Sequence, residues 1–386
     1  MQLDHLIAKV SSSLIAGSRP GQSILEVTIT EADTFNLQPI ADNYRSPSIG
    51  SFERGGQVSE SNLLGWGDKI DLTYLNTDGS NLVDFSYTLP INPRNGTVRF
   101  TYYYQANEVI EPPFNQLDIE SNSTYYELLL RQPVIQKIDQ ETQSFQELAF
   151  GVTAFWQETQ SFLLGKPFPL SIGADNDGQS GVFALRFLTD WTRQDARSVI
   201  ALRSELSLGL DFLGATVNEQ IPGVETIPDG SFLLWRGQAQ WVRFFAPESL
   251  FLIRSNIQIA NDALLSSEQF SIGGFNSVRG YPQDALLTDN GWVASAEVRL
   301  PVLNVPEVQG ILHLIPFMDF GIGWNSGGNS NPEPQHLASV GIGLLWQGGD
   351  RFTGRVDWGI PLVDINSEGR SWQENGVLFS VQWNLF

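Results

Sequence analysis

Strict alternation of apolar and polar residues recurs along almost the whole chain, in stretches longer than ordinary strands. In residues 351–362 every even position is apolar or glycine, whereas the odd positions include Arg351, Arg355 and Asp357. Because successive side chains of a β-strand point to opposite faces, each such stretch predicts a strand with one apolar and one polar face. The chain is therefore predicted to be all-β.

Alternation alone also fits a soluble β-sandwich, in which one sheet face packs on the core and the other meets water. Three features favour a transmembrane barrel. The stretches run to roughly 10–14 residues, whereas an average strand has about 5–6 and a membrane-spanning strand about 9–11. Their polar faces mix both signs of charge, as a water-filled lumen allows. Aromatic residues recur near their ends, as interfacial girdles require; they include Trp156, Trp191, Trp324, Trp346 and Trp383.

Sixteen stretches are predicted to form the wall of an antiparallel transmembrane β-barrel. They cover residues 49–57, 68–77, 81–90, 96–106, 122–133, 144–156, 180–193, 196–209, 230–244, 249–260, 267–273, 290–301, 308–324, 336–347, 350–362 and 376–386. An even number is typical of bacterial barrels. The first and last strands are expected to pair, because an open sheet edge is not tolerated in lipid.

The lengths of the connections predict an orientation in a bacterial outer membrane, with the N-terminus in the periplasm. Periplasmic turns of such barrels are short and extracellular loops are longer. The expected short turns are 76–80, 303–307 and 347–350, and the expected outer loops are 325–335 and 363–375. In this count the long connections 157–179 and 211–230 fall on the periplasmic side, which departs from the rule.

The residues before the wall form a separate unit. Two short alternating runs, 6–15 and 23–32, flank a turn signal at 17–21. An isolated hairpin is marginally stable, so residues 1–33 are expected to be the end of a mixed domain truncated upstream. Residues 34–47 are predicted to be a linker, and 48–386 the barrel.

Composition excludes several kinds of function. A formal net charge of −21 argues against nucleic acid, whose phosphates attract basic surfaces. The chain has no cysteine, and its three histidines are too scattered for a metal cluster. No stretch of about 18 apolar residues predicts a transmembrane helix. No nucleophile accompanies His313 in a recognisable motif, so we expect no metal, no cofactor and no enzymatic activity.

Two opposite charges stand out against this background. Arg279 lies in a run that otherwise reads as a loop, beside Gly273, Gly274 and Gly280, which permit close backbone approach and positive φ. About forty residues later, Asp319 lies in the middle of an apolar strand. The residues alone leave two possibilities: either an ion pair pins the loop inside the barrel, or each charge is an ordinary one and the two never meet.

Other charges fall on the predicted inner face. They are Glu127, Arg131, Arg186, Asp190, Arg203, Glu205, Arg236, Glu297, Arg299, Arg355 and Asp357. The simplest interpretation is a solvated lumen whose charges balance one another. A second interpretation is a polar track along which an unfolded polypeptide slides.

Taken together, these motifs resemble a known family. The order of the Gly-Gly…Val-Arg-Gly-Tyr loop, the Phe-x-Asp-x-Gly strand and a preceding hairpin is similar to that of the two-partner secretion transporters of the haemolysin secretion/activation (ShlB/FhaC/HecB) type. The resemblance implies a sixteen-stranded barrel behind periplasmic POTRA domains, with residues 1–33 as the last POTRA hairpin. It also implies that the loop after the eleventh strand folds into the lumen. Its tip would meet Asp319, and the matching residues are Val278, Arg279, Gly280 and Tyr281 in the loop and Phe317, Asp319 and Gly321 in the strand.

The same resemblance implies a function. It predicts an outer-membrane pore that exports a large unfolded exoprotein, haemolysin-like or adhesin-like, with Arg279 and Asp319 latching the loop. The implied partners are that exoprotein, outer-membrane lipid and the barrel assembly machinery, which would read the final strand. In that strand Phe386 stands one step out of phase with the alternation. The alternatives are an outer-membrane protein assembly or insertion factor of the same superfamily, a small-molecule porin and an outer-membrane hydrolase.

Overall fold

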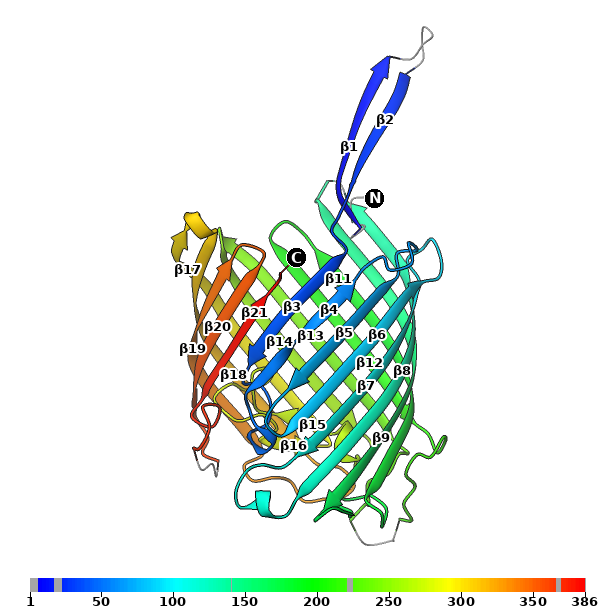
Figure 1. The fold of residues 1–386 in the computed structure, drawn as a ribbon, viewed down its shortest axis with the longest axis vertical. Helices are drawn as coiled ribbons and strands as arrows, with labels where there is room; N and C mark the ends of the chain where they lie inside the picture. The colour runs from blue at the N-terminus through cyan, green and yellow to red at the C-terminus, as the bar shows by residue number, and fades with distance from the viewer. Residues whose placement is uncertain (1–5, 17–22, 140, 221–224, 366–368, 386) are drawn as a thin grey trace.

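The computed structural model describes residues 6–16, 23–139, 141–220, 225–365 and 369–385. Within them, sixteen antiparallel strands close into a barrel in chain order (Figure 1). The wall strands are β3 (Phe35–Asp42), β4 (Glu53–Glu60), β5 (Lys69–Asn76), β6 (Ser80–Pro90), β7 (Thr97–Glu108), β8 (Ile119–Asp139), β9 (Ser144–Leu163), β11 (Gln179–Gln194), β12 (Ser198–Gly209), β13 (Leu233–Ala246), β14 (Ser249–Ala260), β17 (Asn290–Val305), β18 (Gly310–Trp324), β19 (His336–Gly348), β20 (Phe352–Pro361) and β21 (Val377–Trp383). The prediction of an all-β, sixteen-stranded barrel is confirmed.

Smaller elements complete the chain. The strands β1 (Ile7–Ala16) and β2 (Ser23–Glu31) form a separate hairpin, and β10 (Lys166–Pro167) extends the edge of β9. Inside the barrel lie β15 (Phe270–Ile272) and β16 (Leu286–Thr288). The short 3-10 turns within the described residues are η1 (Pro47–Ile49), η2 (Phe114–Gln116), η3 (Ser266–Glu268) and η4 (Pro306–Val308). No helix in the described chain is long and apolar enough to cross a membrane.

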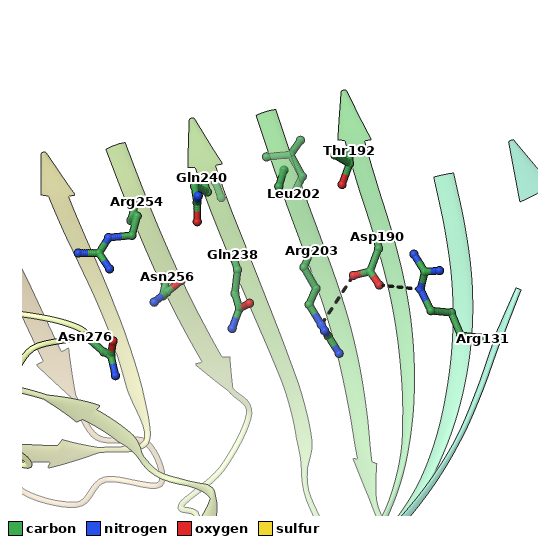
Figure 2. A pocket seen from close by; sticks show the side chains of 12 residues that line it. Arg131, Asp190, Thr192, Leu202, Arg203, Gln238, Gln240, Arg254, Asn256 and Asn276 are labelled. Carbon is green, nitrogen blue, oxygen red and sulfur yellow. Dashed lines mark hydrogen bonds and ion pairs between the residues drawn. The ribbon is translucent and has the colours of Figure 1, made fainter. Parts of the chain in front are cut away.

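The two faces of the wall differ as the alternation predicts. In β20 the outward side chains of Val356 and Trp358 are exposed, whereas the inward Asp357 is buried. Large apolar surfaces exposed in this way are typical of contact with lipid. Part of the lumen side of β8 to β14 is polar: Asp190 lies 3.3 Å from Arg131 and 3.8 Å from Arg203 (Figure 2).

The correct number of strands conceals two compensating errors in the sequence prediction. Residues 35–42 were assigned to the linker 34–47 but form β3, the first strand of the wall, so the barrel begins at Phe35 rather than at residue 48. Proline lacks a backbone donor and is therefore rare inside a sheet, yet β3 contains Pro39. It is tolerated here because β3 pairs with β21 only at residues 40–42. Conversely, residues 267–273 are not a wall strand: only β15 forms there, and it pairs with β16.

Because β3 is the first wall strand, several connections lie at the other end of the barrel from the one predicted. We call the end next to the β1–β2 hairpin the hairpin end, and the opposite end the loop end (Figure 1). The turn at residues 76–80 was predicted to share an end with 303–307 and 347–350, but it lies at the loop end. The long connections 157–179 and 211–230 also lie at the loop end, so the departure from the usual pattern disappears.

Two features predicted from the sequence lie outside the described residues. The turn at 17–21 and the final residue, Phe386, belong to the residues that the structure does not describe. The assignment of residues 1–33 to a POTRA domain stays a prediction.

The barrel closes through a short seam between its first and last strands. Strand β21 pairs with β3 at Ser380, Val381 and Gln382. Next to these pairs, Asn43 continues the seam: its backbone N–H donates to the Phe379 carbonyl (3.2 Å), its side-chain Nδ2 donates to the Val377 carbonyl (2.9 Å) and its Oδ1 accepts from the Phe379 N–H (2.7 Å). One amide therefore extends the shortest seam of the wall.

We predict that Asn43→Ala weakens barrel closure. The change removes two hydrogen bonds to strand backbone, each contributing about 0.5–1.5 kcal/mol. Urea titration in lipid vesicles should show a lower free energy of unfolding by about 1–3 kcal/mol. Gln57→Ala is the control, because the Gln57 side chain in β4 makes no hydrogen bond to the described chain; equal stability of the two variants would contradict the role of Asn43.

Candidate functional site

The connection between β14 and β17, residues 261–289, packs against the wall strands β17, β18 and β20. We call it the inward loop. It follows the eleventh wall strand. Its apolar residues pack against the wall in a buried cluster, which comprises Ile272, Val278, Tyr281, Leu286, Val293 and Leu337. Apolar wall residues thus give the loop a dry seat.

Glycines allow the loop tip to touch the wall. Gly273, Gly274 and Gly280 have φ values of 117°, 86° and 97°, which side chains disfavour. Gly280 lies against Gly359 of β20, where an added Cβ would be 2.6 Å from the Gly280 nitrogen. Gly321 of β18 leaves similar room, since a Cβ there would be 2.5 Å from Ile272 Cγ2. Sequence reasoning missed Gly359, although a glycine within a strand signals close backbone approach.

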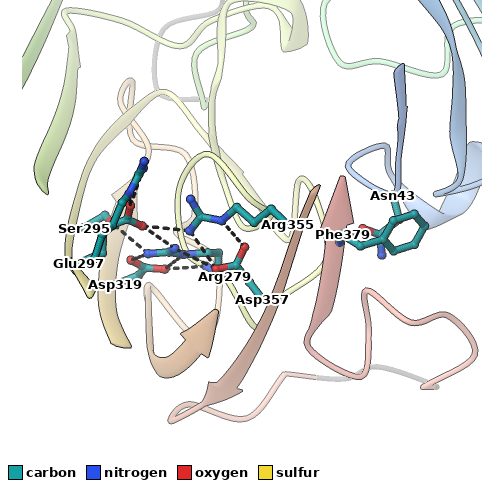
Figure 3. A network of polar contacts seen from close by, with 9 residues as sticks. Asn43, Arg279, Ser295, Glu297, Asp319, Arg355, Asp357 and Phe379 are labelled. Atoms are coloured by element: carbon teal, nitrogen blue, oxygen red, sulfur yellow. Dashed lines mark hydrogen bonds and ion pairs between the residues drawn. The ribbon is translucent and has the colours of Figure 1, made fainter. Parts of the chain in front are cut away.

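Arg279 reaches the wall through a forked contact with Asp319 of β18 (Figure 3). Its Nε donates to Asp319 Oδ2 at 2.8 Å, and its Nη2 donates to Oδ1 at 2.9 Å. The Arg279 backbone N–H also donates to Oδ2, at 3.1 Å. The fork fixes orientation in a way that a lysine ammonium does not, and the backbone bond fixes the loop tip as well as its side chain.

The remaining donors of Arg279 meet two further wall strands. Nη1 lies 3.0 Å from Glu297 Oε2 and 3.4 Å from Asp357 Oδ1, and Nη2 lies 3.1 Å from Ser295 Oγ. The guanidinium carbon is 3.6 Å from the centre of the Phe317 ring, a favourable cation–π position. All five side-chain N–H groups of Arg279 therefore have acceptors, which is what a fully buried guanidinium requires.

The charges around Arg279 balance. Arg355 contacts Asp357 at 2.6 Å and Glu297 at 3.0 Å, and Arg299 contacts Glu297 at 2.8 Å. We call this group the Arg279 cluster; its ionised members are Arg279, Arg299, Arg355, Glu297, Asp319 and Asp357. Burial alone would lower the pKa of Arg279, but hydrogen bonding and attraction from Asp319, then Asp357 and Glu297, raise it above its usual value. The cluster is formally neutral.

The four lumen charges singled out from the sequence thus lie together. Glu297, Arg299, Arg355 and Asp357 were expected to be solvated wall charges, but they surround the loop tip, and Glu297 and Asp357 are buried. Sequence reasoning did not connect them to Arg279 because β17 and β20 are distant along the chain. Their common inward phase was the only signal.

A second ionic contact holds the base of the inward loop. Glu268 of η3 is buried and accepts from Arg186 of β11 at 2.6 Å and from Arg236 of β13 at 2.8 Å. The Arg186 guanidinium also lies 3.9 Å from the centre of the Phe155 ring. Here the loop supplies the carboxylate and the wall supplies the arginines, the reverse of the arrangement at Arg279. The sequence placed both arginines in the lumen but did not identify Glu268 as their partner.

The loop also touches the closing seam. Phe275 stacks on Tyr44, which follows β3, with ring centres 4.2 Å apart. Burial raises the pKa of the Tyr44 hydroxyl above its usual range, so the ring stays neutral. Gln373 joins both parts: its Oε1 accepts from the Gln283 N–H (2.7 Å), and its Nε2 donates to the Asn43 carbonyl (2.6 Å). Loop position and seam geometry are therefore linked by direct contacts.

Tyr281 fixes the far side of the tip. Its buried hydroxyl accepts from the Val363 N–H at 3.0 Å and lies 2.9 Å from the carbonyl oxygens of Ala338 and Val363. In the described residues no group of three or more metal-ligating side chains is assembled. The chemistry of the site consists of ionic and hydrogen-bonded contacts between a loop and a wall.

Comparison with known proteins identifies the family. Residues 21–345 match the family described as haemolysin secretion/activation protein ShlB/FhaC/HecB. This chain belongs to that family. It is accordingly a β-barrel of the bacterial outer membrane, in a family that serves protein transport by two-partner secretion.

Individual relatives are similar to this chain at low sequence identity. The heme/hemopexin transporter protein HuxB of Haemophilus influenzae is 24% identical over 370 residues, covering 90% of this chain and 60% of the relative. The structure of CdiB from Escherichia coli has a TM-score of 0.75 at 19% identity, covering 100% of this chain and 69% of that one. The outer membrane protein assembly factor BamA of Nitratidesulfovibrio vulgaris is 32% identical over 128 residues, 31% of this chain and 15% of the relative. This ShlB-family chain therefore spans about 60% of the length of HuxB.

We predict that Gly359→Ala displaces the inward loop and opens the lumen to ions. The added methyl group would be 2.6 Å from the Gly280 nitrogen and 2.7 Å from the Arg279 carbonyl carbon, so the loop tip must leave β20 and the Arg279 contacts must lengthen. Planar-bilayer recordings should show a severalfold rise in mean ion conductance.

Gly354→Ala is the matched control in the same strand, because its added Cβ would meet its nearest neighbour, the Phe352 ring, at 3.4 Å. Equal conductance of the two variants would show that the close approach at Gly359 does not hold the loop.

Proposed function

We propose that this chain is the conducting barrel of a two-partner secretion transporter, which exports a large unfolded exoprotein, haemolysin-like or adhesin-like, through its lumen. The observation that carries the proposal is the inward loop bound to the wall through the Arg279 cluster. A loop seated by non-covalent contacts closes the lumen to solutes at rest and leaves when a competing polypeptide enters. In this proposal the loop acts as a plug and Arg279 and Asp319 as its latch.

The physical chemistry of the cluster suits a reversible latch. Three arginines and three carboxylates in the described chain satisfy one another, so the Arg279 cluster has no unpaired buried charge. Removing one partner of such a buried network costs about 3–5 kcal/mol. When the whole loop leaves its seat, by contrast, both sets of charges regain hydration from the water in the lumen. Water entering with the client therefore lowers the barrier to release.

The proposed orientation places the hairpin end in the periplasm and the loop end outside the cell. Short turns gather at the hairpin end, as periplasmic turns do, and the long connections gather at the other. In this orientation the client meets the lumen first and the inward loop second. Folding of the client outside the cell would then make export irreversible. We further propose that the β1–β2 hairpin ends a POTRA domain that delivers the client to this opening.

The test is export of the exoprotein encoded beside this gene by cells carrying the full-length transporter. We expect Arg279→Ala and Asp319→Ala to reduce surface delivery at least tenfold while raising ion leakage, because the plug is no longer held. Arg54→Ala is the control, since Arg54 forms an exposed pair with Asp78. Normal export by both latch variants would refute the latch, and absence of export by the unmodified protein would refute the transporter.

A second function, insertion of other barrels, is favoured by one observation. The β21–β3 seam has three register pairs, far fewer than its neighbours in the wall. Strands that separate easily offer edges to an incoming barrel strand. Purified protein in liposomes would then accelerate insertion of an unfolded outer-membrane barrel. A rate equal to that of empty liposomes would exclude this alternative.

A further inference from the structure

A cavity of about 480 Å³ remains in the lumen beside the inward loop. Figure 2 shows it along the wall from β8 to β14, with Asn276 of the loop at one edge. The cavity lies on the hairpin-end side of the loop. Any molecule entering from that end would meet this surface before it reaches the Arg279 cluster.

The lining side chains form two rows across neighbouring strands. Strand register sets Gln238 opposite Asn256, and Gln240 opposite Arg254. The complete rows are Asp190, Arg203, Gln238 and Asn256, and Thr192, Ala201, Gln240 and Arg254. Members of the two rows lie two residues apart on each strand, so the rows are separated by about 6.5–7 Å.

Five polar side chains that line the cavity have no hydrogen-bond or ion-pair partner in the described chain. Gln238, Gln240, Asn256, Asn276 and Arg254 make no side-chain hydrogen bond or ion pair within the described residues, and all five line the cavity. The Arg279 cluster and the Glu268 contact differ, because their charged groups are engaged with one another. Donors and acceptors available for a guest are therefore concentrated here.

The chemistry of the strip fits a peptide backbone. A primary amide carries both a donor and an acceptor, which complement the C=O and N–H of a peptide group. An extended chain repeats every two residues, about 6.5–7 Å, which equals the separation of the rows. The lining contains no aromatic side chain on which a base would stack. Contacts to the backbone alone would accept any client sequence.

We propose that Gln238, Gln240, Asn256 and Asn276 form a binding strip for the backbone of an extended, unfolded polypeptide. The proposal rests on the proposed export function and identifies where the client is held inside the barrel. Arg254, without an ion-pair partner in the described chain, adds attraction for carboxylates and carbonyl oxygens. The second row continues from Arg254 to Ser295, its register partner, which contacts Arg279. A polypeptide on the strip therefore lies directly beside the latch.

The experiment measures binding of a fluorescently labelled, disordered and uncharged polypeptide of about 40 residues to the purified protein in detergent, by fluorescence anisotropy. The triple variant Gln238→Ala/Gln240→Ala/Asn256→Ala should raise Kd about tenfold or more. Gln194→Ala is the matched control, because Gln194 shares the inward phase of Asp190 and Thr192 but does not line the cavity. Polyethylene glycol and dextran of equal size serve as competitors and should not displace the polypeptide.

Several results would overturn the proposal: no polypeptide binding by the unmodified protein, an unchanged Kd in the triple variant, or displacement by dextran as effective as by unlabelled polypeptide. If the triple variant fails to fold, the single variants Gln238→Ala and Gln240→Ala replace it, each expected to raise Kd about threefold; unchanged values would refute the strip.

Export by the same variants in cells separates the two proposals. Export by the unmodified protein together with unchanged polypeptide binding in the variants would refute the strip alone. Polypeptide binding without any export would refute the transporter alone.

Discussion

A buried arginine is stable only when every one of its donors is satisfied, and Arg279 meets this requirement only when the inward loop is fully seated. Its partners come from β17, β18 and β20, so one guanidinium ties three wall strands to one loop. Glu268 ties the base of the same loop to β11 and β13 with the opposite polarity. The loop is thus fastened at its tip and at its base to different sectors of the wall, and Gln373 joins it to the seam. Plug position, wall geometry and seam closure depend on one set of contacts.

Much of the fold followed from the sequence because a barrel wall imposes period-two alternation on every strand. The failures came where that constraint is weak. Strand β3 contains Pro39 and is short, so its pattern did not distinguish it from a linker. Residues 270–272 alternate like a wall strand, yet they pair with β16. Three residues carry too little pattern to reveal which strand they pair with. The two errors offset each other in the count but reversed the end assigned to several connections.

The candidate site was only partly predictable. The residues left the Arg279–Asp319 pairing open and a resemblance favoured it, whereas the roles of Ser295, Glu297 and Asp357 depend on strand register, which alternation does not specify. Glu268 was invisible for the same reason: its partners Arg186 and Arg236 precede it by 82 and 32 positions. The sequence places Gly359 within a strand, but it does not show which backbone segment approaches this glycine. Long-range register is the information that local patterns lack.

The central claim is that the inward loop must leave its seat for a polypeptide to pass. The chain has no native cysteine, and a Cβ at Gly321 would lie 2.9 Å from Val278 Cγ2. The variant Val278→Cys/Gly321→Cys therefore places two cysteines in contact across loop and wall for oxidation to a disulfide. Its single-cysteine parents are the controls, and Gly321→Cys alone measures the effect of the new side chain on Ile272, 2.5 Å from the added Cβ. Export of the exoprotein is the measurement: we expect it to stop when the disulfide forms and to return after reduction. Undiminished export through fully cross-linked barrels would contradict the account.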